Sequence, residues 1–242
     1  SGSVDSGSFT ISAPPTLNAT ATVDANVSCN GLGDGQLTAS ATGGTAPYNY
    51  LWSTSSTNAT IGSLTPATYN LTVTDNNGCT ATTQGTITEP TALISTALVD
   101  SNVTCNGFLN GGVKASVTGG TTPYNFAWTN SATTAALTGI SAGVYTVVVT
   151  DANGWTITDS VSVTEPVPFV ATTVIDSKGT CSGFFDGRAT ASATGRTSPY
   201  DYLWSNTATT ASSTGIAAGT YNVTVTDNNG CTASDSETIT ES

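Results

Sequence analysis

The stretch YNLTVT at residues 69–74, followed by DNNG at residues 75–78, decides the fold of this chain. Apolar and polar residues alternate in the first part, as in a β-strand that buries one face and exposes the other. The second part is typical of a tight hairpin turn, because Asn and Gly tolerate the backbone angles that such a turn needs. We therefore expect a half-buried strand that leads into a hairpin.

This stretch and its surroundings occur three times at a constant interval. The cysteines Cys29, Cys105 and Cys181 are 76 residues apart. The same interval separates the aromatic landmarks Trp52, Trp128, Trp204 and Tyr69, Tyr145, Tyr221. Six or seven short strands fit into each interval, which is typical of a small two-sheet sandwich. We predict an all-β protein with a tandem array of three immunoglobulin-like antiparallel β-sandwich modules, at residues 15–90, 91–166 and 167–242.

The first fourteen residues extend the repeat pattern. Residues 10–14, TISAP, correspond to residues 86–90, TITEP. We therefore predict that residues 1–14 are the terminal strand of a preceding repeat. Two interpretations stay open: a boundary inside a longer array, or a strand that completes a neighbouring subunit by β-strand addition.

Composition excludes several functions. The 242 residues carry a formal net charge of −12, and only 8% of them are charged. The four cations, Lys114, Lys178, Arg188 and Arg196, are too few to bind a nucleic-acid backbone. No apolar run approaches the roughly 20 residues of a membrane span. His is absent, which removes the commonest general base, and we predict that the chain is not an enzyme.

The aromatic residues are predicted to fill the cores of the modules. A Trp on a middle strand and a Tyr that opens the penultimate strand resemble the core Trp and the tyrosine corner of immunoglobulin-like folds. Trp155 lies outside this pattern and is a possible binding aromatic.

Two pairs of cysteines share one spacing, since Cys29 and Cys79 are 50 residues apart, as are Cys181 and Cys231. We expect the first interstrand loop and the last hairpin to lie at the same end of a module, so we predict a disulfide within each of these two modules. Such a bond would contribute about 4 kcal/mol and would indicate an oxidising compartment. Trp155 replaces the partner cysteine in the middle module, which predicts an unpaired thiol at Cys105.

Calcium is the one metal that the sequence brings into consideration. Asp34 and the turn that begins at Asp75 are expected to gather oxygen ligands at one end of the first module. Asp186 and Asp227 repeat this arrangement in the third module. The competing interpretation is that Asp-Asn-Asn-Gly is only a turn sequence.

Several motifs together resemble a known family. They are GGTAPY at 43–48, LWS at 51–53, ATYNLTVTD at 67–75 and NGCT at 77–80. This combination resembles the SprB repeat, and the resemblance covers essentially the whole chain. It implies a very large cell-surface adhesin of gliding bacteria of the Bacteroidota, exported by the type IX secretion system and attached to the outer membrane. The family brings no catalytic or ligand residues to this sequence.

These observations favour a non-catalytic repeat segment of a filamentous adhesin that serves as stalk and adhesive surface. The expected partners are a polysaccharide or solid surface and neighbouring repeats, outside the cell. Alternatives are carbohydrate-binding or spacer modules of a secreted enzyme, or a donor-strand filament subunit.

Overall fold

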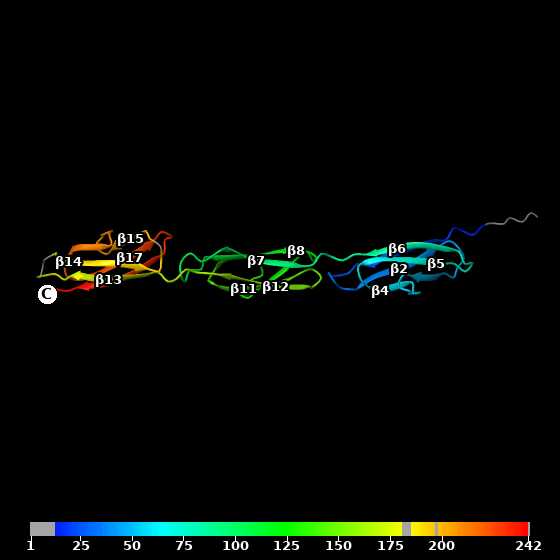
Figure 1. Ribbon diagram of the computed structural model, residues 1–242, viewed down its shortest axis with the longest axis horizontal. Helices are drawn as coiled ribbons and strands as arrows, with labels where there is room; N and C mark the ends of the chain where they lie inside the picture. The colour runs from blue at the N-terminus through cyan, green and yellow to red at the C-terminus, as the bar shows by residue number, and fades with distance from the viewer. Residues whose placement is uncertain (1–12, 181–184, 197, 242) are drawn as a thin grey trace, which may run out of the picture. The chain divides into compact units, whose positions relative to one another are not determined.

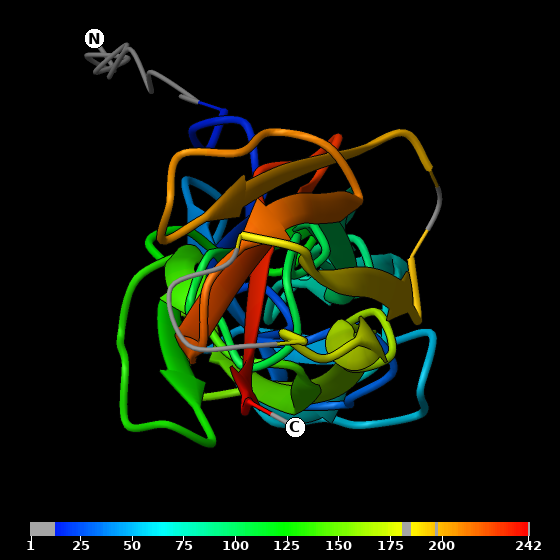
Figure 2. The ribbon, with the colours of Figure 1, turned by 90° about the vertical axis from the view of Figure 1, so that its left-hand side faces the viewer.

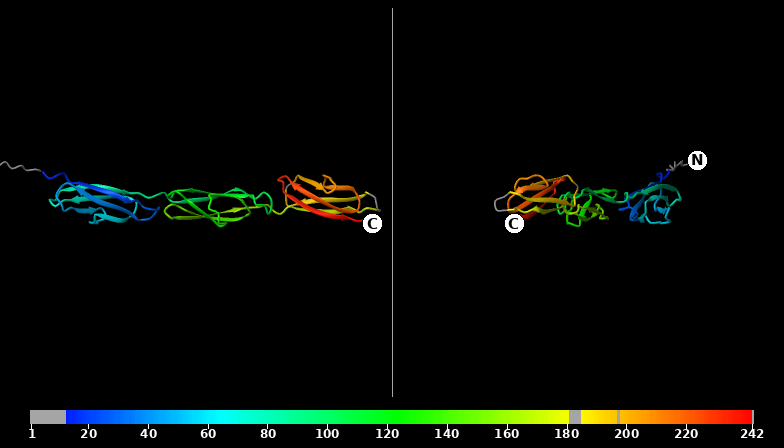
Figure 3. Two further views of the ribbon diagram at one scale, coloured as in Figure 1. Left: turned by 180° about the vertical axis from the view of Figure 1, so that it is seen from behind. Right: turned by 60° about the vertical axis from the view of Figure 1, so that its left-hand side comes forward.

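The computed structural model describes residues 13–180, 185–196 and 198–241. These residues form eighteen β-strands in six three-stranded sheets, and no helix occurs among them (Figures 1 and 3). The described residues accordingly contain no helix that could cross a membrane. The prediction of an all-β, immunoglobulin-like fold is confirmed.

We refer to β1–β6 as repeat 1, β7–β12 as repeat 2 and β13–β18 as repeat 3. Repeat 1 contains β1 (Asn18–Ala25), β2 (Gly35–Thr42), β3 (Asn49–Trp52), β4 (Thr60–Leu64), β5 (Ala67–Thr74) and β6 (Thr80–Ile87). Repeat 2 contains β7 (Ile94–Ser101), β8 (Gly111–Thr118), β9 (Asn125–Trp128), β10 (Ala136–Ile140), β11 (Gly143–Thr150) and β12 (Thr156–Val163). Repeat 3 contains β13 (Val170–Ser177), β14 (Gly187–Thr194), β15 (Tyr200–Trp204), β16 (Ser212–Ile216), β17 (Gly219–Asp227) and β18 (Thr232–Ile239). The strands therefore recur at the interval found in the sequence.

Each repeat has the same sheet orders. In repeat 1 one sheet has the order β1-β2-β4 and the other β3-β5-β6. The antiparallel partners Ala21↔Ala39 and Leu71↔Thr83 set the registers of the central strand pairs. Figure 2 shows the strands of repeat 3, in yellow to red, viewed from one end.

The core of repeat 1 lies between its two sheets. Leu37, Leu71 and Val73 are fully buried there, beside Trp52. The indole N–H of Trp52 donates a hydrogen bond to the carbonyl of Asn58 (3.0 Å), which satisfies its one polar atom. Trp128 and Trp204 are buried in the same way, so the predicted core role of all three residues is confirmed.

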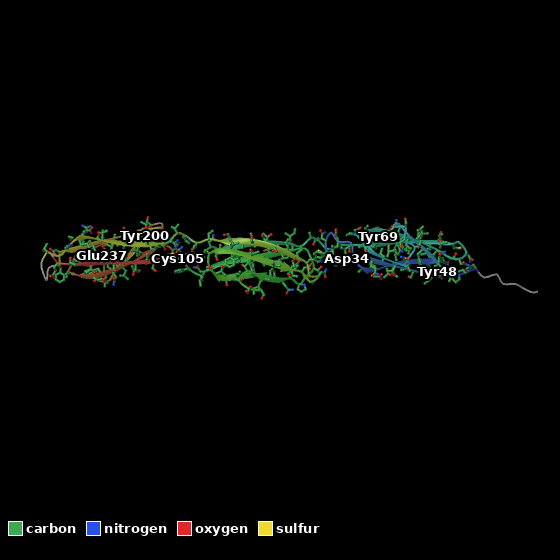
Figure 4. The ribbon with its side chains drawn as sticks, turned by 90° about the horizontal axis from the view of Figure 1, so that it is seen from below. Asp34, Tyr48, Tyr69, Cys105, Tyr200 and Glu237 are labelled. Carbon is green, nitrogen blue, oxygen red and sulfur yellow. A yellow bond between two sulfur atoms is a disulfide. The ribbon has the colours of Figure 1, made fainter. Side chains whose placement is uncertain are left out.

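The predicted tyrosine corner is also present. The hydroxyl of Tyr69 donates to the carbonyl of Thr65, four residues earlier, at 2.9 Å (Figure 4). The hydroxyls of Tyr145 and Tyr221 make the equivalent bonds to Ser141 and Ala217. This bond fixes the entry into the penultimate strand, in which Tyr69, Leu71 and Val73 are buried on alternating positions.

Strand direction gives repeat 1 two chemically different ends. Val27 N–H bonds to the carbonyl of Thr88, so the loop after β1 lies beside the end of β6; we call this the loop end. Gly44 N–H bonds to the carbonyl of Pro15, and Thr45 N–H bonds to Asp75, so the β5–β6 turn lies beside the start of β1. We call this second region the hairpin end. Each repeat thus presents a loop at one end and a hairpin at the other.

The chain divides into two compact units. The first unit contains residues 1–95, 117–125 and 149–157. The last two of these ranges form the hairpin end of repeat 2. The second contains residues 96–116, 126–148 and 158–242, and includes the loop end of repeat 2 with all of repeat 3. A loop end and a hairpin end of successive repeats therefore come together inside each unit.

Candidate functional site

The loop after the first strand has one construction in repeats 1 and 2. Gly31 has a φ of 82°, which favours glycine, and its N–H donates to the carboxylate of Glu89 (2.6 Å). Gly107 has a φ of 78° and bonds to Glu165 in the same way (2.7 Å). These contacts fold the loops that carry Cys29 and Cys105 back onto their own repeats, so each cysteine is held in a defined position.

The hairpin is held by a buried carboxylate. Asp75 is 3% exposed and accepts hydrogen bonds from the N–H groups of Thr45, Asn77 and Cys79, at 2.8–3.0 Å. Burial tends to raise the pKa of Asp75, but these N–H donors outweigh burial and lower it below its ordinary value. Asp151 has the same type of donors and the same net lowering of its pKa. These acids are structural parts of the turn.

In the second unit, a disulfide joins two repeats. Cys105, in the loop of repeat 2, is bonded to Cys231, in the hairpin of repeat 3, with 5.7 Å between their Cα atoms. Figure 4 labels Cys105 at this junction. The bond links residues 126 positions apart, which is one repeat plus the 50-residue spacing predicted within a repeat. Both cysteines are buried.

This bond corrects two predictions. Cys105 is not an unpaired thiol, and Cys231 is not bonded to Cys181. Cys181 itself lies outside the described residues. The physical reason is strand direction: Gly179 forms a bridge with Glu241 at the loop end of repeat 3, whereas Cys231 lies in the hairpin at its other end.

The predicted bond between Cys29 and Cys79 is wrong for the same reason. Both are free thiols, Cys29 buried and Cys79 exposed. Figure 4 labels a residue at each end of repeat 1. Asp34, which is close to Cys29 in sequence, lies at the loop end, and Tyr48 lies at the hairpin end. The hydroxyl of Tyr48 bonds to Gly43, beside the hairpin that carries Cys79.

A buried arginine adds to the junction in the second unit. Nη1 of Arg196 donates to the carbonyl of Thr104 (3.2 Å), the residue before Cys105. Nε of Arg196 lies 3.7 Å from Asp227, and both side chains are almost fully buried. A cavity of about 110 Å³ remains beside the disulfide, lined in part by Phe108 and Phe169. The junction thus combines a covalent bond and a buried ion pair beside a small cavity.

The junction in the first unit has no disulfide, but the carbonyl of the residue before the loop cysteine again accepts a hydrogen bond. The side-chain amide of Asn153, in the hairpin of repeat 2, donates to the carbonyl of Ser28, the residue before Cys29 (2.6 Å). Trp155 occupies the position equivalent to Cys231 and is 38% exposed. Burial, followed by the charge of Asp151, raises the pKa of the Cys29 thiol. Cys29 is therefore a poor nucleophile that faces a hairpin without a cysteine.

The acids considered for calcium do not gather at one end. Asp34 lies in the loop after β1 and accepts bonds from the backbone and hydroxyl of Ser28, which lower its pKa. Asp75 lies in the hairpin at the opposite end, where N–H donors surround its oxygens. Asp186 and Asp227 are separated in the same way, bonded to Thr180 and to the hairpin N–H groups respectively. Among the described residues, no group of three or more His, Cys, Asp or Glu side chains could hold a metal ion.

The junction between repeats was missed by the sequence analysis. The signal that could have revealed it is the 126-residue spacing of Cys105 and Cys231, together with the exchange of Cys for Trp155 in one hairpin only. A bond from each loop to the next hairpin leaves Cys29 opposite Trp155 and therefore unpaired. Bonds within repeats leave Cys105 unpaired instead.

The structure defines a chain of immunoglobulin-like β-sandwich repeats that are joined through their ends. The SprB repeat family matches residues 20–57, 98–133 and 179–209. The predicted resemblance is confirmed, and the chain carries SprB repeats in three regions. None of the curated proteins matches the sequence.

Solved structures show distant similarity. A tetra-tandem repeat in the extending region of a large adhesion protein shares 17% identity, with 93% of this chain and 74% of that chain covered and a TM-score of 0.28. Immunoglobulin domains 1–5 of Sidekick-1 share 10% identity over 92% of this chain and 59% of that chain, with a TM-score of 0.36. A Bacteroides ovatus glucan-utilization protein, SGBP-B, shares 16% identity over 92% and 70%, with a TM-score of 0.19. At these TM-scores, the similarities carry no conclusion about function.

Proposed function

We propose that this chain is a non-catalytic, load-bearing segment of a filamentous cell-surface adhesin, in which it serves as stalk and adhesive surface. The observation that carries the proposal is the Cys105–Cys231 disulfide between successive repeats. A bond within a repeat would stabilise that repeat alone, whereas a bond between repeats transmits tension from one to the next. SprB repeats belong to cell-surface adhesins, which supports the proposal.

The chemistry of the acids supports a non-catalytic role. A general acid or base needs a carboxyl group that can reach a substrate and exchange a proton with it. Asp75 and Asp151 are instead buried, with their oxygens engaged by N–H groups and their pKa values lowered. They stabilise turns and are not free to react.

The outer faces of the strands suit weak, repeated contacts. Hydroxyl groups pair across neighbouring strands, for example Thr68 with Thr86 and Thr220 with Thr238, both at 3.0 Å. Exposed apolar side chains such as Leu98 and Val174 lie on the first strands of repeats 2 and 3. Hydroxyls and small apolar patches can contact sugar rings or a solid surface weakly, and many repeats would add such contacts into avidity.

We further propose an extracellular, outer-membrane-attached location, export by type IX secretion and a role in surface attachment or gliding. A disulfide among buried cysteines fits an oxidising environment outside the cytoplasm. The partners would be a polysaccharide or solid surface, together with neighbouring repeats.

The test is to alter this segment in the polypeptide that contains it, on living cells. Deletion of residues 15–242 should reduce attachment to polysaccharide-coated and bare glass surfaces. The matched control is replacement by an unrelated immunoglobulin-like stalk with the same number of modules. It should restore attachment only in part, because it restores the length of the stalk but not its adhesive faces. Unchanged attachment after deletion, with loss of a secreted hydrolase activity, would instead identify spacer modules of an enzyme.

A further inference from the structure

The hairpins that carry Cys79 and Cys231 have the same geometry. Both have the sequence DNNGCT, at residues 75–80 and 227–232. The N–H of each cysteine donates to the carboxylate four residues earlier at 2.8 Å. The carbonyl of each cysteine accepts the N–H of that same Asp at 2.9 Å. The backbones of Cys79 and Cys231 are therefore held in the same way in the two hairpins.

Their surroundings differ. Cys231 is 2% exposed because the loop of repeat 2 covers it, whereas Cys79 is exposed in the part of the chain that the structure describes. Beside Cys79 lies a recess of about 310 Å³, lined in part by Pro15, Leu17 and Gly44. Near Cys231 the corresponding space is reduced to about 110 Å³. The two recesses share lining positions, since Leu17 and Gly44 correspond to Phe169 and Arg196.

The residues that occupy the recess in repeat 3 indicate which kind of ligand the recess beside Cys79 would bind. Cys105, Asn106 and Phe108 of the preceding repeat line that space, and Cys105 makes the disulfide. The same Cys-Asn-Gly pattern begins the loop at Cys29, and the Gly–Glu bond folds both described loops in the same way. The ligand that the recess takes is therefore a folded Cys-Asn-Gly loop.

We propose that the hairpin end of repeat 1 is an acceptor site for the Cys-Asn-Gly loop of another SprB repeat, joined to Cys79 by a disulfide. The donor is a repeat that comes directly before repeat 1 in the same polypeptide. In repeat 3 the donor is the directly preceding repeat, and a short connection of this kind gives a high effective concentration of the two thiols. Residues 10–14 also repeat the sequence that ends repeat 1, at residues 86–90.

The bond forms by thiol–disulfide exchange with a small disulfide such as oxidised glutathione. The Cys79 thiolate attacks this disulfide, forms a mixed disulfide and releases one glutathione thiolate, which takes up the proton that Cys79 lost. The thiolate of the donor loop then attacks the Cys79 sulfur and releases the second glutathione thiolate, which takes the second proton. Two protein thiols lose two electrons in total, and one small disulfide gains them.

The test is a count of free thiols in the native polypeptide, purified from its cells with an alkylating agent present and then denatured without reductant. Cys79→Ser should raise the count by one, because the donor cysteine loses its partner. Cys29→Ser is the matched control and should lower the count by one, because Cys29 is unpaired. Since the count is made on denatured protein, it does not depend on adhesion and can fail independently of the proposed function.

Peptide mapping of the same sample identifies the donor. We expect a disulfide-linked pair of peptides that contains Cys79 and a Cys-Asn-Gly-type loop, within a single polypeptide that does not separate into two chains on reduction. A lower count for Cys79→Ser, with an alkylated Cys79 in the wild type, would overturn the proposal. A Cys79 bond that joins two polypeptides and dissociates on reduction would overturn the assignment of the donor to the same chain.

Discussion

The two junctions between repeats differ in their crosslink and in the side chain that bonds to the loop. In the second unit the hairpin of repeat 3 presents Cys231, which is bonded to Cys105. In the first unit the hairpin of repeat 2 presents Trp155, and Cys29 remains a buried free thiol. In both junctions the carbonyl before the loop cysteine, of Ser28 or Thr104, accepts a hydrogen bond from the next repeat. The comparison shows that a loop end and a hairpin end of the same fold can form either a covalent or a non-covalent junction.

The largest effect should come from removal of the covalent junction. Cys231→Ser leaves repeat 3 free to unfold without a crosslink, and the chain-entropy estimate for a loop of 126 residues is about 5 kcal/mol. We expect a separate, earlier unfolding transition for repeat 3 in urea, followed by tryptophan fluorescence. Cys29→Ser is the control, and it should leave the transitions nearly unchanged because no bond is lost. Equal shifts of the urea midpoint in the two variants would show that the disulfide does not distinguish the two junctions.

The converse change should convert the first junction into the second. Trp155→Cys places a thiol opposite Cys29, where the fold already holds the loop and the hairpin together. We expect an oxidised crosslink between Cys29 and the introduced cysteine, which closes a loop of the same length as the Cys105–Cys231 bond. The net gain in unfolding free energy should be roughly 3 kcal/mol, because the chain-entropy estimate of about 5 kcal/mol is reduced by about 2 kcal/mol through the loss of indole contacts. Mass spectrometry of proteolytic peptides identifies the crosslink. Recovery of both cysteines in alkylated form after mild oxidation would show that the first junction lacks the required geometry.

Acidity should weaken both hairpins to a smaller extent. The folded-state pKa values of Asp75 and Asp151 lie below their unfolded values, so their stabilising effect is complete above the unfolded pKa and is lost as pH falls through the folded pKa. We expect a constant urea midpoint between about pH 7 and 5, followed by a decrease below about pH 4. Asp151→Asn should have a lower midpoint at pH 7 and a weaker decrease in acid. An unchanged midpoint in that variant would contradict the structural role of the carboxylate.

The smallest expected effect is a difference in thiol reactivity. Burial and the charge of Asp151 disfavour the thiolate of Cys29, whereas Cys79 is exposed. We expect iodoacetamide to modify Cys79 at least about tenfold faster than Cys29 at pH 8, measured by mass spectrometry over time. Denaturation in urea should make the two rates equal. Faster modification of Cys29 in the folded chain would mean that its junction is open.

The strands and the core could be predicted from sequence because their signals are local. Alternation in residues 69–74 and the Tyr69 and Trp52 landmarks indicate burial without knowledge of the partners. The disulfide partners could not be predicted, because they depend on strand direction. β3 pairs antiparallel with β5, and β4 with β2, so β3 and β4 both run towards the loop end. If all six strands alternated in direction, the loop after β1 and the β5–β6 hairpin would lie at the same end of the repeat. Because β3 and β4 run in the same direction, Cys29 and Cys79 lie at opposite ends instead.

The most direct measurement is a disulfide map of the oxidised 242-residue chain, made by proteolysis without reduction and mass spectrometry. We expect a crosslinked peptide pair that contains Cys105 and Cys231, with Cys29 recovered as an alkylated thiol. This result would establish that successive repeats are joined from loop to hairpin. Peptide pairs that contain Cys29 with Cys79 and Cys181 with Cys231, together with a free Cys105, would contradict it and show that each bond closes within one repeat.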